Sequence, residues 1–209
     1  MPKVDFTKLS DSEEYLLVWA YNVGFFEWFM GSYMYGVDKD ANHKSEIKQL
    51  VDAVKVLHKL FGPPDIDSAK VYRFVTSHKA FTTGSSIRIS HAYALASWTY
   101  SHEGLLSFLS TAALSIKRYA YVLTASSRSI VPMFTAKYLV GCLKKIPSTI
   151  NIKTRSGFVL QMRNFYKQHE VVLLTTKPLR VTAESLPENA TRNYSAIKDG
   201  VRRLVKRHS

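Results

Sequence analysis

The sequence predicts a mainly α-helical fold with two helical lobes, a small β-hairpin region near residues 150–176 and a C-terminal helical arm. Three observations predict this class. Apolar residues recur at spacings of three and four along several long segments. Helix start and stop signals bound the first two of these segments. Strict alternation of apolar and polar residues is confined to a stretch after residue 150.

The first helix is predicted from Asp11 to about Met30. Ser10 and Glu13 have the spacing of a capping box, in which the two side chains close the first helical turn reciprocally. The apolar stretch from Tyr15 to Met34 has about the length of a membrane-spanning helix. It carries a carboxylate, Glu27, and such a group near the middle of a span costs about 2.5–3.5 kcal/mol on insertion scales. The sequence therefore favours a buried core helix.

A second amphipathic helix is predicted from about Lys44 to Phe61, after a loop at residues 38–42. Its apolar positions follow the helical period, and Gly62 with the two prolines after it supplies a sharp stop. The apolar positions that carry this prediction are Ile47, Leu50, Val51, Val54, Leu57 and Phe61.

The middle of the chain is predicted to be mostly helical. Residues 68–81 are ambiguous between a short helix and a strand, and residues 82–86 form a hydroxyl-rich loop. Residues 125–129 are predicted to turn, and Pro132 is tolerable in the first turn of the helix that follows. The predicted helices run over residues 87–102, 105–121 and 130–146.

The chain changes character after residue 150. Apolar alternation on both sides of Gly157, over residues 151–162, predicts a hairpin, and residues 171–176 are predicted to add a third strand. A polar linker is predicted at residues 182–189. The closing helix has an apolar face surrounded by basic residues, and that face consists of Tyr194, Ile197, Val201, Leu204 and Val205.

Acidic and basic residues are concentrated in different parts of the chain. Residues 1–70 hold 8 Lys, no Arg and 11 acidic residues, whereas residues 71–209 hold 21 basic and 5 acidic residues. Between Asp67 and Glu170 the only acidic residue is Glu103. We therefore expect three units. They are an acidic helical lobe (1–67), a basic lobe (68–183), and a linker with a basic amphipathic helix (184–209).

Motifs of catalysis are absent from the sequence. It contains no glycine-rich phosphate loop, no His-Glu-x-x-His, no Gly-x-Ser-x-Gly and no Cys-x-x-Cys, and its seven histidines form no cluster with metal-ligand spacing. The single cysteine, Cys142, excludes an internal disulfide framework and indicates a reducing compartment. The N-terminus lacks the pattern of a secretory signal. We therefore expect no enzymatic activity, cofactor, metal site or small-molecule substrate.

The positive excess predicts a polyanionic partner, because unbalanced charge of this size makes a compact fold less stable unless it is neutralised. Basic side chains can contact phosphates, and interleaved rings can stack on unpaired bases whatever their identity. Single-stranded RNA is the preferred candidate. The predicted RNA-contacting residues are Arg73, Lys79, Arg88, Lys117, Arg118, Arg128, Lys137, Lys144, Lys145, Lys153, Arg155, Arg163 and Lys167. The candidates for stacking on bases are Tyr93, Tyr119, Tyr121, Phe158 and Tyr166.

Residues 86–98 resemble the nucleocapsid proteins of the bunyavirus group, the segmented negative-strand RNA viruses. Several of these carry Leu-Thr-x-x-Arg at a helix start, followed by Leu-Ala-x-Trp. Leu95, Ala96 and Trp98 match the closing part, whereas Ser90 stands at the Arg position and Arg88 is the nearest base. The resemblance implies a two-lobed helical protein that clamps single-stranded RNA in a basic groove and polymerises by lending a terminal arm. The coat proteins of filamentous plant viruses are the next most similar group.

Together these observations predict a non-enzymatic, self-assembling viral nucleocapsid or coat protein, located in the virion and the host cytoplasm and not secreted. Its partners would be single-stranded RNA and further copies of itself, with the face of residues 194–205 as the exchanged arm or docked on its own domain. Two alternatives stay open. One is a structural protein of a ribosome or another ribonucleoprotein. The other, less favoured, is a peripheral membrane or matrix protein that binds anionic lipid.

Overall fold

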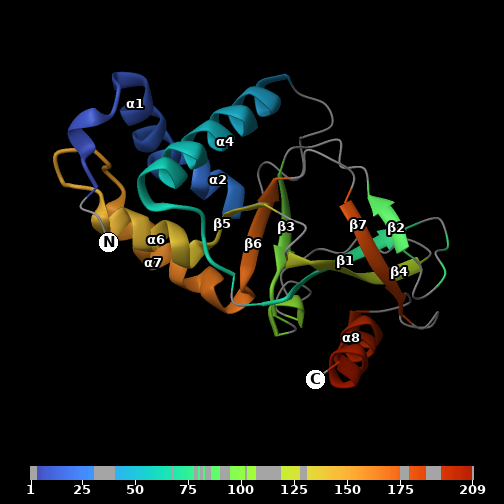
Figure 1. The fold of residues 1–209 in the computed structure, drawn as a ribbon. Helices are drawn as coiled ribbons and strands as arrows, with labels where there is room; N and C mark the ends of the chain where they lie inside the picture. The colour runs from blue at the N-terminus through green and yellow to red at the C-terminus, as the bar shows by residue number, and fades with distance from the viewer. Residues whose placement is uncertain are drawn as a thin grey trace.

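The fold combines a layer of helices with a seven-stranded antiparallel sheet, and a final helix lies apart from the layer (Figure 1). The expectation of a mainly α-helical protein is therefore wrong, because a large sheet occupies the middle and end of the chain. The computed structural model describes residues 4–30, 41–66, 68–77, 80, 82, 86–89, 95–101, 103–106, 119–127, 131–174, 179–186 and 194–208.

The N-terminal helix forms where the sequence predicts it, and its start is the predicted capping box. The Ser10 hydroxyl accepts a hydrogen bond from the Glu13 amide at 3.3 Å, and the Glu13 carboxylate accepts one from the Ser10 amide at 3.0 Å. A short 3₁₀ turn, η1, precedes it. The run is η1 (Phe6–Lys8), α1 (Asp11–Trp19), a π-helical turn η2 (Ala20–Gly24) and α2 (Phe25–Phe29).

The second predicted helix is α4 (Ala41–Phe61), and it begins within the predicted loop at residues 38–42, whose first three residues lie outside the described part of the chain. Gly62 ends it with a φ of 78°, a left-handed conformation that glycine adopts at little cost. Ile47, Leu50, Val54 and Leu57 are all buried. Within the described residues, no helix has the length and apolar character needed to cross a bilayer.

Two later helices, α6 (Ala136–Lys145) and α7 (Arg155–Phe165), complete the helical layer. One apolar core joins them to the N-terminal helices. Phe158 of α7 packs edge-on against Tyr21 and Phe26, with ring centroids 5.1 and 5.2 Å apart. The helical layer therefore contains helices from both of the predicted lobes, residues 1–67 and residues 68–183.

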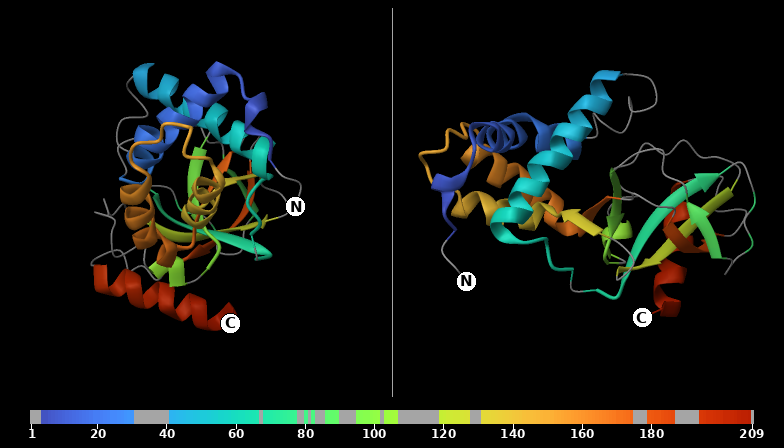
Figure 2. Two further views of the ribbon diagram at one scale, coloured as in Figure 1. Left: turned by 90° about the vertical axis from the view of Figure 1, so that its left-hand side faces the viewer. Right: turned by 45° about the horizontal axis from the view of Figure 1, so that its top comes forward.

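All seven strands pair antiparallel, in the spatial order β2-β7-β4-β1-β3-β6-β5. The helical layer lies beside the β5–β6–β3 end, since Val172 of β6 and Phe134 of β5 belong to its core. Figure 2 shows the curvature of the sheet away from that layer. The strands are β1 (Lys70–Ser77), β2 (Ser86–Ile89), β3 (Leu95–Thr99), β4 (Tyr119–Ser126), β5 (Val131–Phe134), β6 (Glu170–Leu174) and β7 (Leu179–Ser185).

The helix predicted at residues 87–102 is wrong, because β2 and β3 stand there, and the end of the helix predicted at residues 105–121 belongs to β4. The helix predicted at residues 130–146 is confirmed as α6 from residue 136, whereas Pro132 lies in the edge strand β5 before it. Residues 107–118 lie outside the described part of the chain. A short apolar run buried on both sides has no distinctive period, so it cannot be told from a buried helix by pattern alone. The ambiguous segment 68–81 contains β1.

The predicted hairpin at residues 151–162 is also wrong, because residues 155–165 form α7 with Gly157 exposed in its interior. The third strand expected at residues 171–176 is present as β6. The linker expected at residues 182–189 is replaced, up to residue 185, by β7. β7 lies between β2 and β4, but its second part is polar and lacks the apolar alternation that predicts a strand.

The C-terminal helix α8 (Tyr194–His208) forms as predicted. Its Ile197 and Val201 are fully buried and pack with Ala120 and Val122 of β4. In this structure the apolar face of the arm therefore docks on the sheet of its own chain, the arrangement that the sequence left open beside exchange between copies.

Candidate functional site around Glu170

A buried carboxylate lies where the helical layer meets the sheet. Glu170 begins β6, between the helical layer and the sheet, and burial raises its pKa to about 7. The Ser97 hydroxyl and the Trp28 indole, and then the positive charge of Arg73, oppose that rise. A buried ionisable group costs folding free energy, so a carboxylate at this position points to function.

Two further polar groups, on β3 and β1, interact with Glu170 on β6. β1, β3 and β6 are adjacent in the sheet, and Tyr72, Thr99 and Glu170 lie in register across them. Arg73 of β1 and Ser97 of β3 each have a buried polar atom, Nη1 and Oγ respectively, with no hydrogen-bond partner in the described part of the chain. The Ser97 hydroxyl is near enough to Glu170 to lower its pKa, but its geometry is not that of a hydrogen bond. Buried polar groups without a partner need an explanation, and a catalytic role is one of the accepted ones.

The turn before Glu170 is held rigidly. Thr99 Oγ1 donates a hydrogen bond to the Gln168 carbonyl at 2.9 Å, and the Tyr100 amide donates one to the His169 carbonyl at 3.2 Å. His169 has a φ of 48°, a left-handed conformation that costs a non-glycine residue about 1–2 kcal/mol. Gly104 lies directly against this turn, where a Cβ atom would overlap the Gln168 carbonyl. Strain that the surroundings over-determine is found at functional sites.

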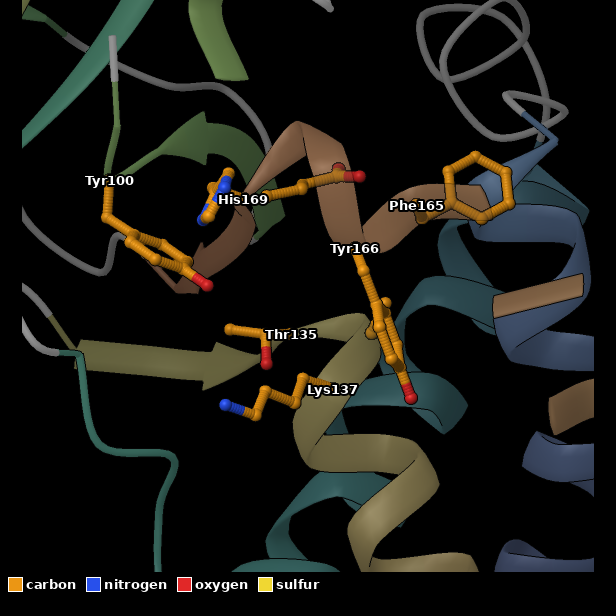
Figure 3. A pocket seen from close by; sticks show the side chains of 8 residues that line it. Tyr100, Thr135, Lys137, Phe165, Tyr166 and His169 are labelled. Atoms are coloured by element: carbon orange, nitrogen blue, oxygen red, sulfur yellow. The ribbon is translucent and has the colours of Figure 1, made fainter. Parts of the chain in front are cut away.

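A cavity of about 250 Å³ opens beside Glu170 (Figure 3). The Tyr100 and His169 rings meet edge to face there, with centroids 5.2 Å apart. Lys137 of α6 is exposed and contributes an ammonium group to the cavity. Tyr166 is half-buried and contributes a phenol. The complete lining is Tyr100, Thr135, Ala136, Lys137, Phe165, Tyr166, His169 and Glu170.

The cavity offers the Glu170 carboxylate, the Lys137 ammonium, the His169 imidazole, hydroxyls and aromatic rings, and the Arg73 guanidinium interacts with Glu170 from outside the lining. Glu170 is the one carboxylate among the residues that line the cavity. Among the described residues there is also no group of three or more potential metal ligands. The arrangement can stabilise a developing positive charge or accept a proton, and it offers flat apolar walls to a planar ring.

Three of the residues predicted from sequence to bind RNA lie at this site. Lys137 and Tyr166 line the cavity, and Arg73 interacts with Glu170. Burial lowers the pKa of Arg73, and the charge of Glu170 opposes this change. Arg73 as a whole is half-buried, whereas its Nη1 is enclosed and has no hydrogen-bond partner among the described residues, and its predicted role as an RNA contact stays a prediction.

Arg155 has a different role from the one predicted. Its guanidinium donates hydrogen bonds to four carbonyls, those of Leu143, Ile146, Pro147 and Ile150, at 2.7–3.1 Å. These carbonyls lie in the last turn of α6 and in the segment after it, where backbone acceptors lack helical partners. Arg155 therefore fastens α7 to the loop that leads into it.

The remaining predicted residues fall into three groups. Tyr121 and Phe158 are core residues with 1% and 0% exposure, so neither ring has a face for a base. Five basic residues are exposed on or beside the helical layer and stay candidates for phosphate contacts, and Tyr119 of β4 is half-buried. The five are Lys144, Lys145, Lys153, Arg163 and Lys167. Arg88 is in β2, paired in register with Arg180. The others, Lys79, Tyr93, Lys117, Arg118 and Arg128, lie outside the described residues.

Sequence reasoning missed Glu170, Ser97 and Thr99. The available signal was the rarity of acids, since Glu103 and Glu170 are the only two between residues 68 and 183. Glu103 is exposed, whereas Glu170 directly precedes a run of four apolar residues, where a carboxylate becomes buried if the run forms a central strand.

No protein-family profile, no curated protein and no solved structure matches this chain.

Proposed function

We propose that the protein is an enzyme that cleaves the nicotinamide–ribose bond of NAD and transfers the ADP-ribosyl group to a nucleophile, with Glu170 as the catalytic carboxylate. The observation that carries the proposal is the buried Glu170, with a pKa of about 7, between the cavity and the unsatisfied polar atoms of Arg73 and Ser97. This proposal replaces the non-enzymatic role that the sequence alone favours.

The solitary carboxylate supports this reaction class. Cleavage of a glycosidic bond passes through an oxocarbenium-like transition state, and an ionised carboxylate stabilises that cation. Most glycosidases need a second carboxyl group, which protonates the leaving oxygen. The cavity offers one carboxylate among its lining residues, so it suits a leaving group that departs without a proton. A pyridinium base meets this requirement, because it leaves as a neutral ring.

The other groups suit the remainder of the substrate. A guanidinium binds phosphate oxygens through two parallel hydrogen bonds. We assign this role to Arg73, which lies outside the cavity lining but interacts with Glu170 and has a buried nitrogen without a partner among the described residues. The rings of Tyr100 and Tyr166 provide walls for the nicotinamide. At about 250 Å³ the cavity is below the usual size of a site that encloses a whole ligand, so it suits the nicotinamide riboside half.

Atoms and electrons balance in the proposed step. The C1′–N bond of the nicotinamide riboside breaks, and its electron pair neutralises the pyridinium nitrogen. The carboxylate of Glu170 stabilises the ribosyl cation, and an acceptor nucleophile or water forms the new bond at C1′. The Ser97 hydroxyl and the Trp28 indole lower the pKa of that carboxylate and so favour its ionised form. The proton of the acceptor passes to Glu170, which then releases it to solvent.

The test is release of nicotinamide from NAD, followed by chromatography, with wild type and Glu170→Gln. We expect a loss of at least 100-fold in kcat for the variant, because the amide retains the shape but not the charge. Glu103→Gln, at the exposed acid of the same stretch, is the matched control and should keep wild-type activity. Wild-type protein that neither binds nor cleaves NAD, with the fold verified by circular dichroism, would refute the proposal.

A second variant tests the role assigned to Arg73. Arg73→Lys keeps the charge but loses the planar fork, so we expect KM for NAD to rise about tenfold while kcat changes less. An equal fall in kcat with an unchanged KM would assign Arg73 to the chemistry instead of the phosphates.

A further inference from the structure

We infer that the outward face of α8 is a docking surface for the phosphate backbone of nucleic acid, separate from the site around Glu170. Arg203 and Lys206 are exposed and Lys198 is half-buried, and all three lie on the part of this helix that the packing of Ile197 and Val201 leaves uncovered. We call the surface of these three cations the α8 basic face. The inference does not depend on the enzymatic activity proposed above.

Helical geometry places the three cations on the broad side of α8 that is not packed on the sheet. Lys198 and Lys206 are eight residues apart, which corresponds to about 12 Å along a helix. Arg203 lies between them along the axis. Along one strand of B-form DNA charges recur about every 3.4 Å, so a surface of this length can meet several phosphates.

The charges of the α8 basic face are largely unneutralised within the described part of the chain. Asp199, the one acidic residue of α8, pairs with Arg202 at 3.1 Å, and both side chains are 53% exposed. Glu184 lies on β7, before α8 in the chain. Burial raises the pKa of Tyr72, and the negative charge of Glu184 raises it further. No salt bridge joins Lys198, Arg203 or Lys206 to a carboxylate among the described residues.

The packing of α8 favours nucleic acid over a lipid surface. A helix that binds a bilayer inserts its apolar face into the boundary between headgroups and acyl chains. In α8 that face is already used, since Ile197 and Val201 have no exposure and Leu204 has 9%. Membrane binding would require α8 to leave the sheet, whereas a phosphate backbone requires only the charges that already point outward. Such binding is independent of base sequence.

The experiment is fluorescence anisotropy with a labelled single-stranded RNA of mixed sequence at several salt concentrations. The test variant is the triple change Lys198→Gln, Arg203→Gln and Lys206→Gln in the full chain. Its matched control removes three exposed lysines of the acidic N-terminal part, by Lys8→Gln, Lys48→Gln and Lys55→Gln. Both variants change the net charge equally, so nonspecific attraction to the whole molecule falls by the same amount in each.

We expect the test variant to lose at least tenfold in affinity and the control less than threefold. The slope of log K against log salt should become shallower by about two in the test variant only, at about 0.7 per lost phosphate contact. Equal effects in the two variants, or no binding of RNA by the wild type, would overturn the inference. Sedimentation with vesicles that contain phosphatidylserine forms the second arm. Binding to vesicles that depends on the α8 basic face, with RNA binding unaltered, would assign the surface to lipid instead.

Discussion

At the scale of single residues, Glu170 links stability to pH. Its folded pKa of about 7 is above the usual value of 4.5, so the folded state binds more protons than the unfolded state between these two pH values. Stability contributed by the neutral carboxyl is fully present below about pH 4.5 and is lost as the pH rises through 7. The ionised carboxylate therefore costs on the order of 3 kcal/mol at pH 8.

Glu170→Gln removes that cost, because the amide is never charged. We expect the variant to unfold at a higher temperature than the wild type at pH 8 and at nearly the same temperature at pH 4.5. Thermal denaturation monitored by circular dichroism at both pH values measures the difference. If the difference in unfolding temperature were the same at both pH values, the pKa of Glu170 would not be raised in the folded protein. Catalysis by the wild type should rise with pH through about 7, since the proposed step needs the ionised form.

Gly104 provides a second prediction at this scale. A methyl group on Gly104 would overlap the Gln168 carbonyl and Thr99 Oγ1, so Gly104→Ala should destabilise the fold by about 1–3 kcal/mol and displace the turn before Glu170. Urea denaturation gives the difference. Gly141→Ala is the control. Gly141 is inside α6, and a methyl group added there would meet open space, so this change should instead stabilise the protein by up to about 1 kcal/mol.

At the scale of elements, Arg155 joins α6 and α7. Its guanidinium satisfies the carbonyls of Leu143, Ile146, Pro147 and Ile150. Removing it leaves partly buried acceptors unpaired, so Arg155→Ala should cost about 2–4 kcal/mol in the free energy of unfolding. Chemical denaturation measures this loss, and Arg163→Ala, at an exposed position of the same helix, should change it by less than about 0.5 kcal/mol.

The same pair of variants distinguishes structure from RNA contact. If Arg155 were a phosphate ligand, Arg155→Ala would weaken RNA binding by a folded protein and leave the unfolding midpoint unchanged. We expect the opposite, because all four of its acceptors belong to its own chain.

At the scale of the whole molecule, α8 is a structural part of the sheet domain. The sequence suggests that removal of residues 184–209 would leave a folded core without higher assemblies. In the structure this deletion uncovers Ala120 and Val122 of β4 and removes the end of β7. We now expect the truncated chain to be strongly destabilised and to aggregate. Size-exclusion chromatography and circular dichroism would test this, and a stable folded monomer would contradict it.

Encapsidation of RNA by self-assembly stays a prediction of the sequence. Purification without nuclease followed by electron microscopy tests it directly, because rings or filaments that contain RNA would support it. The exposed basic residues of the helical layer, such as Lys144 and Lys145, and the α8 basic face are described groups that would contact the RNA. Assembly through α8 would require Ile197 and Val201 to leave their own sheet, so an undocked helix should be detectable by hydrogen exchange in any polymer.

The sequence by itself determined the elements whose signals are local. The capping box at Ser10, the helical period of α4, the stop at Gly62 and the amphipathic face of α8 all depend on neighbours within a few residues. The strand β6 coincides with the third strand predicted at residues 171–176. The basic character of the second part of the chain also follows from composition alone.

Only the tertiary structure decided the sheet and the candidate site. The sequences of β2, β3 and β4 do not by themselves distinguish strand from helix. Their strand conformation depends on partners distant in sequence, as β4 depends on its pairing with β1. Gly157 marks a turn by local rules, yet packing of Phe158 against Tyr21 keeps it within a helix. Arg73, Ser97 and Glu170 are isolated in the sequence and meet because β1, β3 and β6 are neighbours in the sheet. Burial, which raises the pKa of Glu170, arises only when the helical layer covers that part of the sheet.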